Sequence, residues 1–382
     1  MTILEEKRKW LLTGGVVAIG LTILGGLAYP QQFFISWLMG EVFWLGLALG
    51  SLAWAMIHYL TGGRWGNPLR RIFESAMGTL PFLLATFLPL LFGLRFLYPW
   101  AAGNAPAADH VMPQHHIYMS EWAFALRGLV VFGIWILLGW RLRSLSIQQD
   151  RTESVEPTRK LRTLSGPGLV VYPLTATFVF VDWIMSTEAN WYSTVFPILI
   201  CIGQMLSALS AGILVLFLTR RQKEGAGVTG PETFQHLGSL LLALTMMWAY
   251  LAFSQLLIIW SGDLPHEISW YLHRSAGLWK YVALFLFAFH FAIPFALLLS
   301  RRNKKYIERL ALVAAMVLVA HVVDVWWLIT PSFHPGGLWF HWMNLTAFLG
   351  IGGLWLGLFG SNLARAPLLP LNDPRFAVAT PV

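Results

Sequence analysis

Residues 309–330 read RLALVAAMVLVAHVVDVWWLIT, a long apolar run that only His321 and Asp324 interrupt. About twenty apolar residues in a helix can cross the hydrocarbon core of a bilayer, which is roughly 30 Å thick. In lipid a helix satisfies its own backbone hydrogen bonds, whereas a polar side chain needs a partner from the protein. The run therefore predicts a transmembrane helix whose two polar side chains have a structural or functional role.

The rest of the chain has the same character. Of its 382 residues 57% are hydrophobic and only 12% are charged, whereas about 25% charged residues are usual in soluble domains. We therefore predict an all-α, polytopic integral membrane protein with about ten transmembrane helices. The short segment Ser186–Asn190 between the fifth and sixth spans predicts a tight helical hairpin. The predicted spans are 10–29, 36–60, 75–98, 119–140, 168–186, 191–219, 233–260, 276–300, 309–330 and 339–362.

The basic residues predict the orientation of these helices. If the N-terminus is cytoplasmic, 22 of the 26 Lys and Arg residues fall on the cytoplasmic side, which is the positive-inside pattern. Only Arg95 and Arg274 fall on the other side, while Arg127 and Lys280 lie within spans. We therefore expect both termini to be cytoplasmic and attribute the net charge of +8 to membrane orientation rather than to nucleic-acid binding. The first span is expected to stay uncleaved, since no small-residue cleavage pattern follows it.

Several kinds of site are excluded by the sequence. The single cysteine, Cys201, rules out an internal disulfide, a cysteine-ligated iron–sulfur cluster and a C-x-x-C-H haem attachment. No P-loop, dinucleotide fingerprint, G-x-S-x-G or H-E-x-x-H motif occurs. The external segment Tyr98–Ser120 holds Asp109 and three histidines, but without fixed ligand spacing, so we expect a solvated loop or partner contact rather than a metal site. We expect no metal, redox cofactor or soluble catalytic domain in this chain.

An internal repeat is indicated by two stretches, FVFVDWIMST (178–187) and VAHVVDVWWLIT (319–330). Each places an aspartate, Asp182 or Asp324, near the external end of a span. In each bundle a tyrosine also begins the preceding span, with a basic residue nine positions later. We therefore predict two duplicated four-helix bundles flanked by the first and last helices. The corresponding segments are 1–30, 31–190, 191–331 and 332–382.

Charged side chains inside the predicted spans should be paired across helices. An unpaired ionisable group in hydrocarbon costs several kcal/mol, so each one suggests a function by default. We predict that Arg127 pairs with Asp182 and that Lys280 pairs with Asp324. Two interpretations stay open at this point: static ion pairs that hold helices together, or parts of a proton path.

A proton path needs groups that exchange protons at several depths. The second bundle offers more of them, because the middle of the first is nearly apolar. His290 and His321 could alternatively be axial haem ligands, although isolated buried histidines are more often hydrogen-bonded core residues. The candidates for the proton path are Glu41, Glu121, Arg127, Asp182, Gln204, His236, Lys280, His290, His321 and Asp324.

Three longer strings resemble one known family. They are DWIMSTEANWYSTVF (182–196), MMWAYLAFSQLLIIWSGDLPHEISWYLHR (246–274) and FAFHFAIPFALLLSR (287–301). The chain is similar to the NrfD/polysulfide-reductase membrane-subunit family, and most of all to the F subunits of bacterial alternative complex III. The resemblance covers most of the chain, including the helix count, the duplication and the external pair His273–Arg274.

The resemblance implies an integral subunit of a quinol:cytochrome c (or other electron acceptor) oxidoreductase in a bacterial inner membrane, not catalytic alone. It implies that haem c and iron–sulfur clusters reside in partner subunits, namely an iron–sulfur subunit and multihaem cytochromes, and that a homologous ten-helix subunit is a further partner. A contact with quinone or quinol is implied by the family alone. The residues that match the family's suggested proton half-channels are Arg127, Asp182, Lys280, His290, His321 and Asp324.

The expected function is therefore scaffold and proton conduction beside quinol oxidation. The alternative is a secondary transporter, which duplicated bundles and intramembrane charges also fit. Such transporters usually have helices broken at corresponding places in both halves. The prolines of the predicted spans, such as Pro173 and Pro294, do not align in that way.

Overall fold

The computed structural model is all-helical throughout the part of the chain that it describes. That part comprises residues 7–63, 65–103, 117–152, 154–188, 191–219, 230–365 and 367. Ten helical stretches within it are long and apolar enough to cross a membrane. The number of spans predicted from the sequence is thus confirmed.

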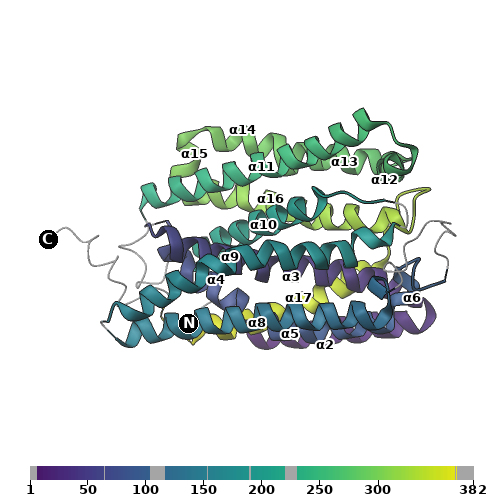
Figure 1. Ribbon diagram of the computed structural model, residues 1–382. Helices are drawn as coiled ribbons and strands as arrows, with labels where there is room; N and C mark the ends of the chain where they lie inside the picture. The colour runs from purple at the N-terminus through teal and green to yellow at the C-terminus, as the bar shows by residue number, and fades with distance from the viewer. Residues whose placement is uncertain are drawn as a thin grey trace.

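The helices lie side by side along one common direction (Figure 1). The first half contains α2 (Arg8–Ala28), α3 (Pro30–Thr61), α4 (Asn67–Met77), α5 (Leu80–Phe87), η1 (Leu88–Phe92), α6 (Leu94–Leu97), α8 (Glu121–Arg151), α9 (Glu156–Trp183) and η2 (Met185–Thr187). The second contains α10 (Phe196–Thr219), α11 (Pro231–Gly262), α12 (Pro265–Ser275), α13 (Trp279–Leu286), η4 (Phe287–Ala292), α14 (Ile293–Leu299), α15 (Arg301–Lys305), α16 (Ile307–Ile329), η5 (Thr330–Ser332) and α17 (Trp342–Ala364).

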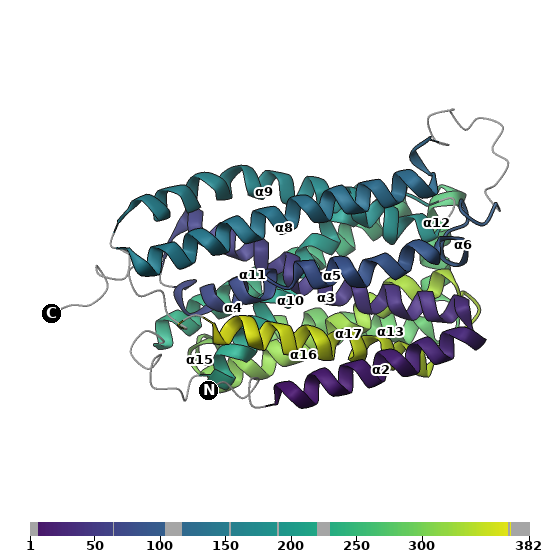
Figure 2. The same ribbon diagram turned by 90° about the horizontal axis from the view of Figure 1, so that it is seen from below.

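The two ends of the bundle differ in character. We call the end where α2 begins and α17 stops the basic end, because it also holds α15 with its run of Arg and Lys residues (Figure 2). The opposite end, which holds α6 and α12, we call the far end; η5 packs against α12 there. The duplication of the two bundles and the orientation in the membrane stay predictions.

The core of the molecule is organised around α3. Residues 35–56 of this helix are buried without exception, and α3 packs against α4, α9, α10 and α17. The helices α11 and α13–α16 lie on one side of it, and α2, α5, α8 and α17 lie on the other (Figure 1). A helix buried on every side has to be apolar or fully partnered all round, so a charged residue within it is unexpected.

Small residues let the first and last helices approach closely. A Cβ atom on Gly15 of α2 would lie 2.9 Å from the backbone nitrogen of Leu354 in α17, and one on Gly353 would lie 2.7 Å from the carbonyl oxygen of Leu11. The hydroxyl of Thr22 donates to that of Thr346 at 2.8 Å across the same interface. Such contacts are typical of helix pairs in membranes, where packing rather than hydrophobicity drives association.

Several helix boundaries differ from those predicted. The fourth span continues to Arg151 rather than 140, and the fifth already starts at Glu156 rather than 168, because both helices continue into polar sequence beyond their apolar parts. The third span starts at Asn67 rather than 75, since α4 buries its arginines in ion pairs. The predicted hairpin between the fifth and sixth spans is longer than expected, because α10 begins only at Phe196, where a proline occupies the first turn.

The α2–α17 contact can be tested with two neighbouring glycines. Gly15→Ala should lower the free energy of unfolding by about 1–3 kcal/mol, because the new methyl group meets the backbone of α17. Gly14→Ala is the matched control, since nothing lies within 4 Å of a Cβ there. Thermal unfolding in lipid nanodiscs measures both. Equal melting temperatures for the two variants would contradict this packing.

Candidate functional site

A cavity of about 870 Å³ lies in the second half of the molecule. Its wall is formed mainly by α10, α11, α12, α16 and the α13–η4 segment, and it consists mostly of aromatic and aliphatic side chains. Ligand pockets typically have this size and this composition, with a few polar groups that orient the ligand. Among the polar side chains of the wall are Gln204, Gln255, Tyr271, Arg274, His321 and Asp324.

The cavity opens sideways toward the surface that the membrane would cover. Phe253 of α11 and Phe287 of η4 both line it, yet they are 62% and 58% exposed on the outside of the bundle. The helix α11 packs against α14 and α15 toward the basic end, which leaves room between α11 and α13 toward the far end. An apolar molecule could therefore enter from the lipid without crossing the polar ends of the bundle.

His321 and Asp324 project from the same face of α16 into this cavity. Their spacing of three residues places them one above the other on a helix, and His321 Nδ1 lies 3.6 Å from Asp324 Oδ2. Both side chains are about 4% exposed. The residues of α16 that face the core around them are small or apolar, among them Ala314 and Val317. This histidine–aspartate pair can accept and release a proton inside an otherwise apolar cavity.

His290 stands next to this pair on an irregular helix. It lies in η4, a π-helical segment, and such segments often occur at functional sites. Its ring stacks on His321 with a centroid distance of 5.7 Å and meets Trp248 edge-on at 4.2 Å. The ring is fully buried, and neither of its nitrogens has a hydrogen-bond partner among the described residues. Gln204, His321 and Asp324 thus line one cavity, and His290 lies beside His321.

A polar network closes the far end of the cavity. Arg274 is 1% exposed and donates to Glu188 Oε1 at 3.2 Å and to the carbonyl oxygen of Leu328 at 2.6 Å. His273 also contacts Glu188, at 3.2 Å. Burial lowers the pKa of Arg274 to about 10, so this guanidinium remains charged at neutral pH. These residues fix α12 to the loop after η2 and to α16.

Tyr271 belongs to the same end of the cavity. Gln255 Nε2 donates to its hydroxyl at 3.3 Å, while Gln255 Oε1 accepts from Ser193 at 3.2 Å. Burial raises the pKa of Tyr271 to about 12, which keeps it neutral. Neither Gln255 nor Tyr271 was a candidate from the sequence, because a single amide and a single phenol in apolar runs give no signal of their own.

The predicted pair of Lys280 with Asp324 is wrong. Lys280 is exposed, and its Nζ lies 5.2 Å from the ring centroid of its neighbour Tyr281 rather than near the buried Asp324. The chain turns into α13 through Gly277, which has a φ of +55°. Trp279 then takes the inward position, fully buried against Trp326. The next residue on a helix points about 100° away, so Lys280 is directed outward.

The predicted pair of Arg127 with Asp182 is confirmed. Arg127 Nε donates to Asp182 Oδ2 at 2.7 Å, and Asp182 is 3% exposed. The same guanidinium donates to the carbonyl oxygen of Tyr118 at 2.8 Å and lies 3.8 Å from the centroid of its ring. Burial and the charge of Asp182 raise the pKa of Tyr118 to about 12. The pair links α8 to α9 at the far end of the molecule.

The other candidates from the sequence lie apart from the cavity. Glu41 of α3 is fully buried, and neither carboxylate oxygen has a hydrogen-bond partner among the described residues. Glu121 is exposed at the far end, where it pairs with Arg95 at 3.3 Å. His236 is exposed in the first turns of α11, about 18 Å along the helix from Trp248 at 1.5 Å per residue. No chain of described side chains connects His236 to His290.

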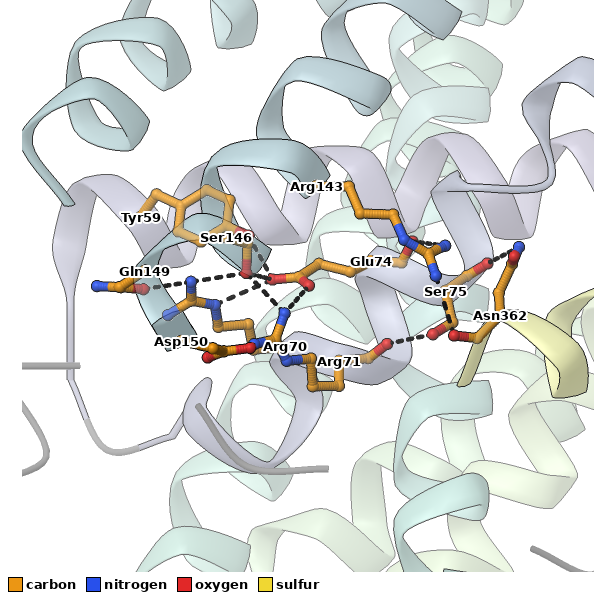
Figure 3. A network of polar contacts seen from close by, with 10 residues as sticks. All are labelled: Tyr59, Arg70, Arg71, Glu74, Ser75, Arg143, Ser146, Gln149, Asp150 and Asn362. Atoms are coloured by element: carbon orange, nitrogen blue, oxygen red, sulfur yellow. Dashed lines mark hydrogen bonds and ion pairs between the residues drawn. The ribbon is translucent and has the colours of Figure 1, made fainter. Parts of the chain in front are cut away.

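A buried network at the basic end was not predicted from the sequence, because Arg70 and Arg71 fall in the presumed loop between the predicted spans 36–60 and 75–98. Glu74 accepts hydrogen bonds from Arg70 Nε at 3.0 Å, Arg71 at 2.5 Å, Tyr59 at 2.7 Å and Ser146 at 2.5 Å (Figure 3). All of these side chains are buried. The detectable signal was the spacing of four residues between an arginine and a glutamate in a short amphipathic stretch.

The network joins four helices at this end. Arg71 also pairs with Asp150 of α8, and Arg143 of α8 donates to the carbonyl oxygen of Asn362 in α17 at 2.9 Å (Figure 3). Tyr59 contributes the connection to α3. The Glu74 carboxylate has four donors, so it is fully satisfied as an anion. A carboxylate held in this way fastens helices together and is poorly suited to carry protons.

Among the described residues, no group of three or more His, Cys, Asp or Glu side chains is arranged to hold a metal ion. The histidines between residues 110 and 116, which the sequence analysis considered for this role, lie outside the described residues.

The fold and the cavity together define a class: a multi-pass membrane protein with ten apolar helices and an internal apolar cavity. No protein-family model matches the chain, and no curated protein matches it. The resemblance to alternative complex III subunits therefore rests on the sequence strings alone.

The two bases of the predicted repeat should behave differently on substitution. Arg127→Met should lower the free energy of unfolding by about 3 kcal/mol, because Asp182 is left buried without its cation. Lys280→Met should cause no measurable change, because Lys280 is exposed and pairs with no acid among the described residues. Thermal unfolding in nanodiscs compares the two. A loss of stability for Lys280→Met as large as that for Arg127→Met would instead indicate that Lys280 pairs with Asp324.

Proposed function

We propose that this chain is an integral membrane subunit of a quinol:electron acceptor oxidoreductase resembling alternative complex III. In this proposal it contributes scaffold, a contact with the quinol and a path for protons. Haem c and iron–sulfur clusters belong to the partner subunits that the resemblance implies. The basic end faces the cytoplasm, because positively charged segments are retained on that side.

The observation that supports this proposal most is the apolar cavity that contains the His321–Asp324 pair. A quinol has a polar head and a long apolar tail, so it partitions into the bilayer and reaches its site from the side. The cavity opens in that direction and offers a few polar groups in an apolar wall. The cavity thus offers polar contacts for the head of the quinol and apolar contacts for its tail.

The proposed chemistry assigns a role to each polar group of the inner cavity. When a quinol is oxidised, its hydroxyl protons leave together with the electrons, so a proton acceptor has to lie beside the head. His321 takes such a proton, and Asp324 at 3.6 Å stabilises the imidazolium that forms. The electrons pass to the cofactors of partner subunits.

A secondary transporter is the less favoured candidate. Transporters commonly bind substrate where helices are interrupted at corresponding places in two repeats. Here η4 interrupts the eighth span away from its ends, whereas η1, η2 and η5 lie at the ends of the third, fifth and ninth spans. In the predicted duplication the eighth span corresponds to the fourth, whose helix α8 is continuous, so the interruption at η4 has no equivalent in the first half.

The role of Asp324 can be tested in the assembled complex with a matched control. Asp324→Asn should slow quinol oxidation and the coupled proton release by roughly 10- to 100-fold, because the imidazolium loses its counter-charge. Asp263→Asn makes the same change at an exposed position after α11 and should leave both rates unchanged. Stopped-flow measurement of quinol turnover and of proton release checks this. Full activity of Asp324→Asn in an intact complex would refute the proposed role.

A further inference from the structure

Tyr172 does not line the cavity itself, but its hydroxyl contacts a residue that does. It lies on α9, and its hydroxyl is 3.0 Å from Gln204 Oε1 on α10. The two side chains are 3% and 1% exposed. Gln204 lines the cavity, whereas Tyr172 does not. This hydrogen bond therefore connects α9, in the first half of the chain, to α10, which forms part of the cavity wall in the second half.

The position of Gln204 is fixed by the close approach of α3 and α10. A Cβ on Gly50 of α3 would lie 2.1 Å from the carbonyl oxygen of Gln204, and one on Gly46 would lie 3.2 Å from its Cγ. The backbone and the first part of the side chain are thus held between two helices. Only the terminal amide can still rotate, and a half-turn of it exchanges the positions of its oxygen and nitrogen atoms.

The hydrogen bond to Tyr172 decides that rotation. A phenol is a better donor than acceptor, so its O–H donates to the amide oxygen and the amide nitrogen is turned away from it. Gln204 Nε2 is buried and has no hydrogen-bond partner among the described residues. A buried donor without a partner is costly. Gln204 belongs to the wall of the cavity, so an acceptor bound against this part of the wall can satisfy the N–H groups of its amide.

We propose that Tyr172 is a positioning residue that holds the Gln204 amide so that its N–H donates to an oxygen acceptor of the ligand in the cavity. The inference rests on the proposed function, in which that acceptor is a carbonyl oxygen of the quinone. The fixed amide gives the cavity a donor at Gln204 on α10 and a proton acceptor at His321 on α16. Both ring oxygens of a quinone or quinol can be recognised by such a pair.

A consequence for specificity follows from the donor character of this amide. A quinone oxygen can only accept hydrogen bonds, whereas a quinol hydroxyl can either donate or accept. With Tyr172 present, the N–H of Gln204 suits both forms. In Tyr172→Phe the amide is free to turn its oxygen to the cavity, which a quinone cannot use. The variant should therefore lose affinity for quinone to a greater extent than for quinol.

The test is a double-mutant cycle in the complex purified from its membranes, with a short-chain menaquinone and a short-chain ubiquinone as probes. Tyr172→Phe should weaken the binding of the preferred quinone about 3- to 10-fold, the range expected for one hydrogen bond. Gln204→Met, which keeps the length of the side chain without its amide, should weaken it at least as much. The double variant should match Gln204→Met alone, because Tyr172 acts only through Gln204.

The control removes an equivalent hydroxyl outside the cavity. Tyr59→Phe deletes a buried hydroxyl that donates to Glu74 at 2.7 Å in the basic-end network, so it should lower thermal stability and leave quinone affinity unchanged. The inference is overturned if wild type binds quinone and Tyr172→Phe binds it equally well. It is also overturned if the double variant weakens quinone binding by the product of the two single-variant factors. Failure of the wild-type complex to bind either quinone would instead remove the proposed function and this inference with it.

Discussion

The structure depends on one constraint: inside a bilayer no water is present to hydrogen-bond a buried polar group, so partners have to come from the protein. The chain meets it in three places with a partner of opposite charge. Glu74 at the basic end has four donors, Asp182 has the guanidinium of Arg127, and Arg274 at the far end has a carboxylate and backbone carbonyl oxygens. Each set joins segments that are distant in sequence, so these groups fasten the bundle together.

A second group of polar side chains does not follow this pattern. His290 and the amide nitrogen of Gln204 are buried without partners among the described residues, and His321 has only the 3.6 Å contact to Asp324. All of them gather at or beside the one large cavity described above. Unsatisfied buried polar groups are costly, and a ligand or a mobile proton in the cavity can complete those that lie there. Glu41 is also buried without a partner among the described residues but lies apart from the cavity, so it is the concentration of such groups around one cavity that marks the candidate functional site.

The sequence predicts the architecture well because the signal for a membrane span is long and local. Ten apolar runs gave ten helices, and the aspartate–arginine pair of the first bundle was predicted from charge alone. The pairing of Lys280 failed because neighbouring helical positions point in different directions, and the turn at Gly277 set the rotation of α13. Arg70 and Arg71 were assigned to a loop because a short amphipathic helix with two arginines does not look like part of a span.

The cavity itself could not be predicted from the sequence. It depends on how α11 and α13 diverge and on the irregular turn of η4, neither of which leaves a pattern in the residues. The proposed role of Tyr172 depends on the close approach of α3 to α10 at Gly46 and Gly50. Glycines are frequent throughout this chain, so the sequence alone does not show that these two mark a close contact between helices.

The central claim is that a quinone head reaches the interior of this chain between Gln204 and His321. Photolabelling of the purified complex with an azido-quinone, followed by mass spectrometry of the labelled peptides, tests it most directly. The account predicts label on α10 near residues 199–204 and on α16 near residues 321–328, which line the cavity, and loss of that label when excess unlabelled quinone competes. Label confined to partner subunits or to helices remote from the cavity would contradict it.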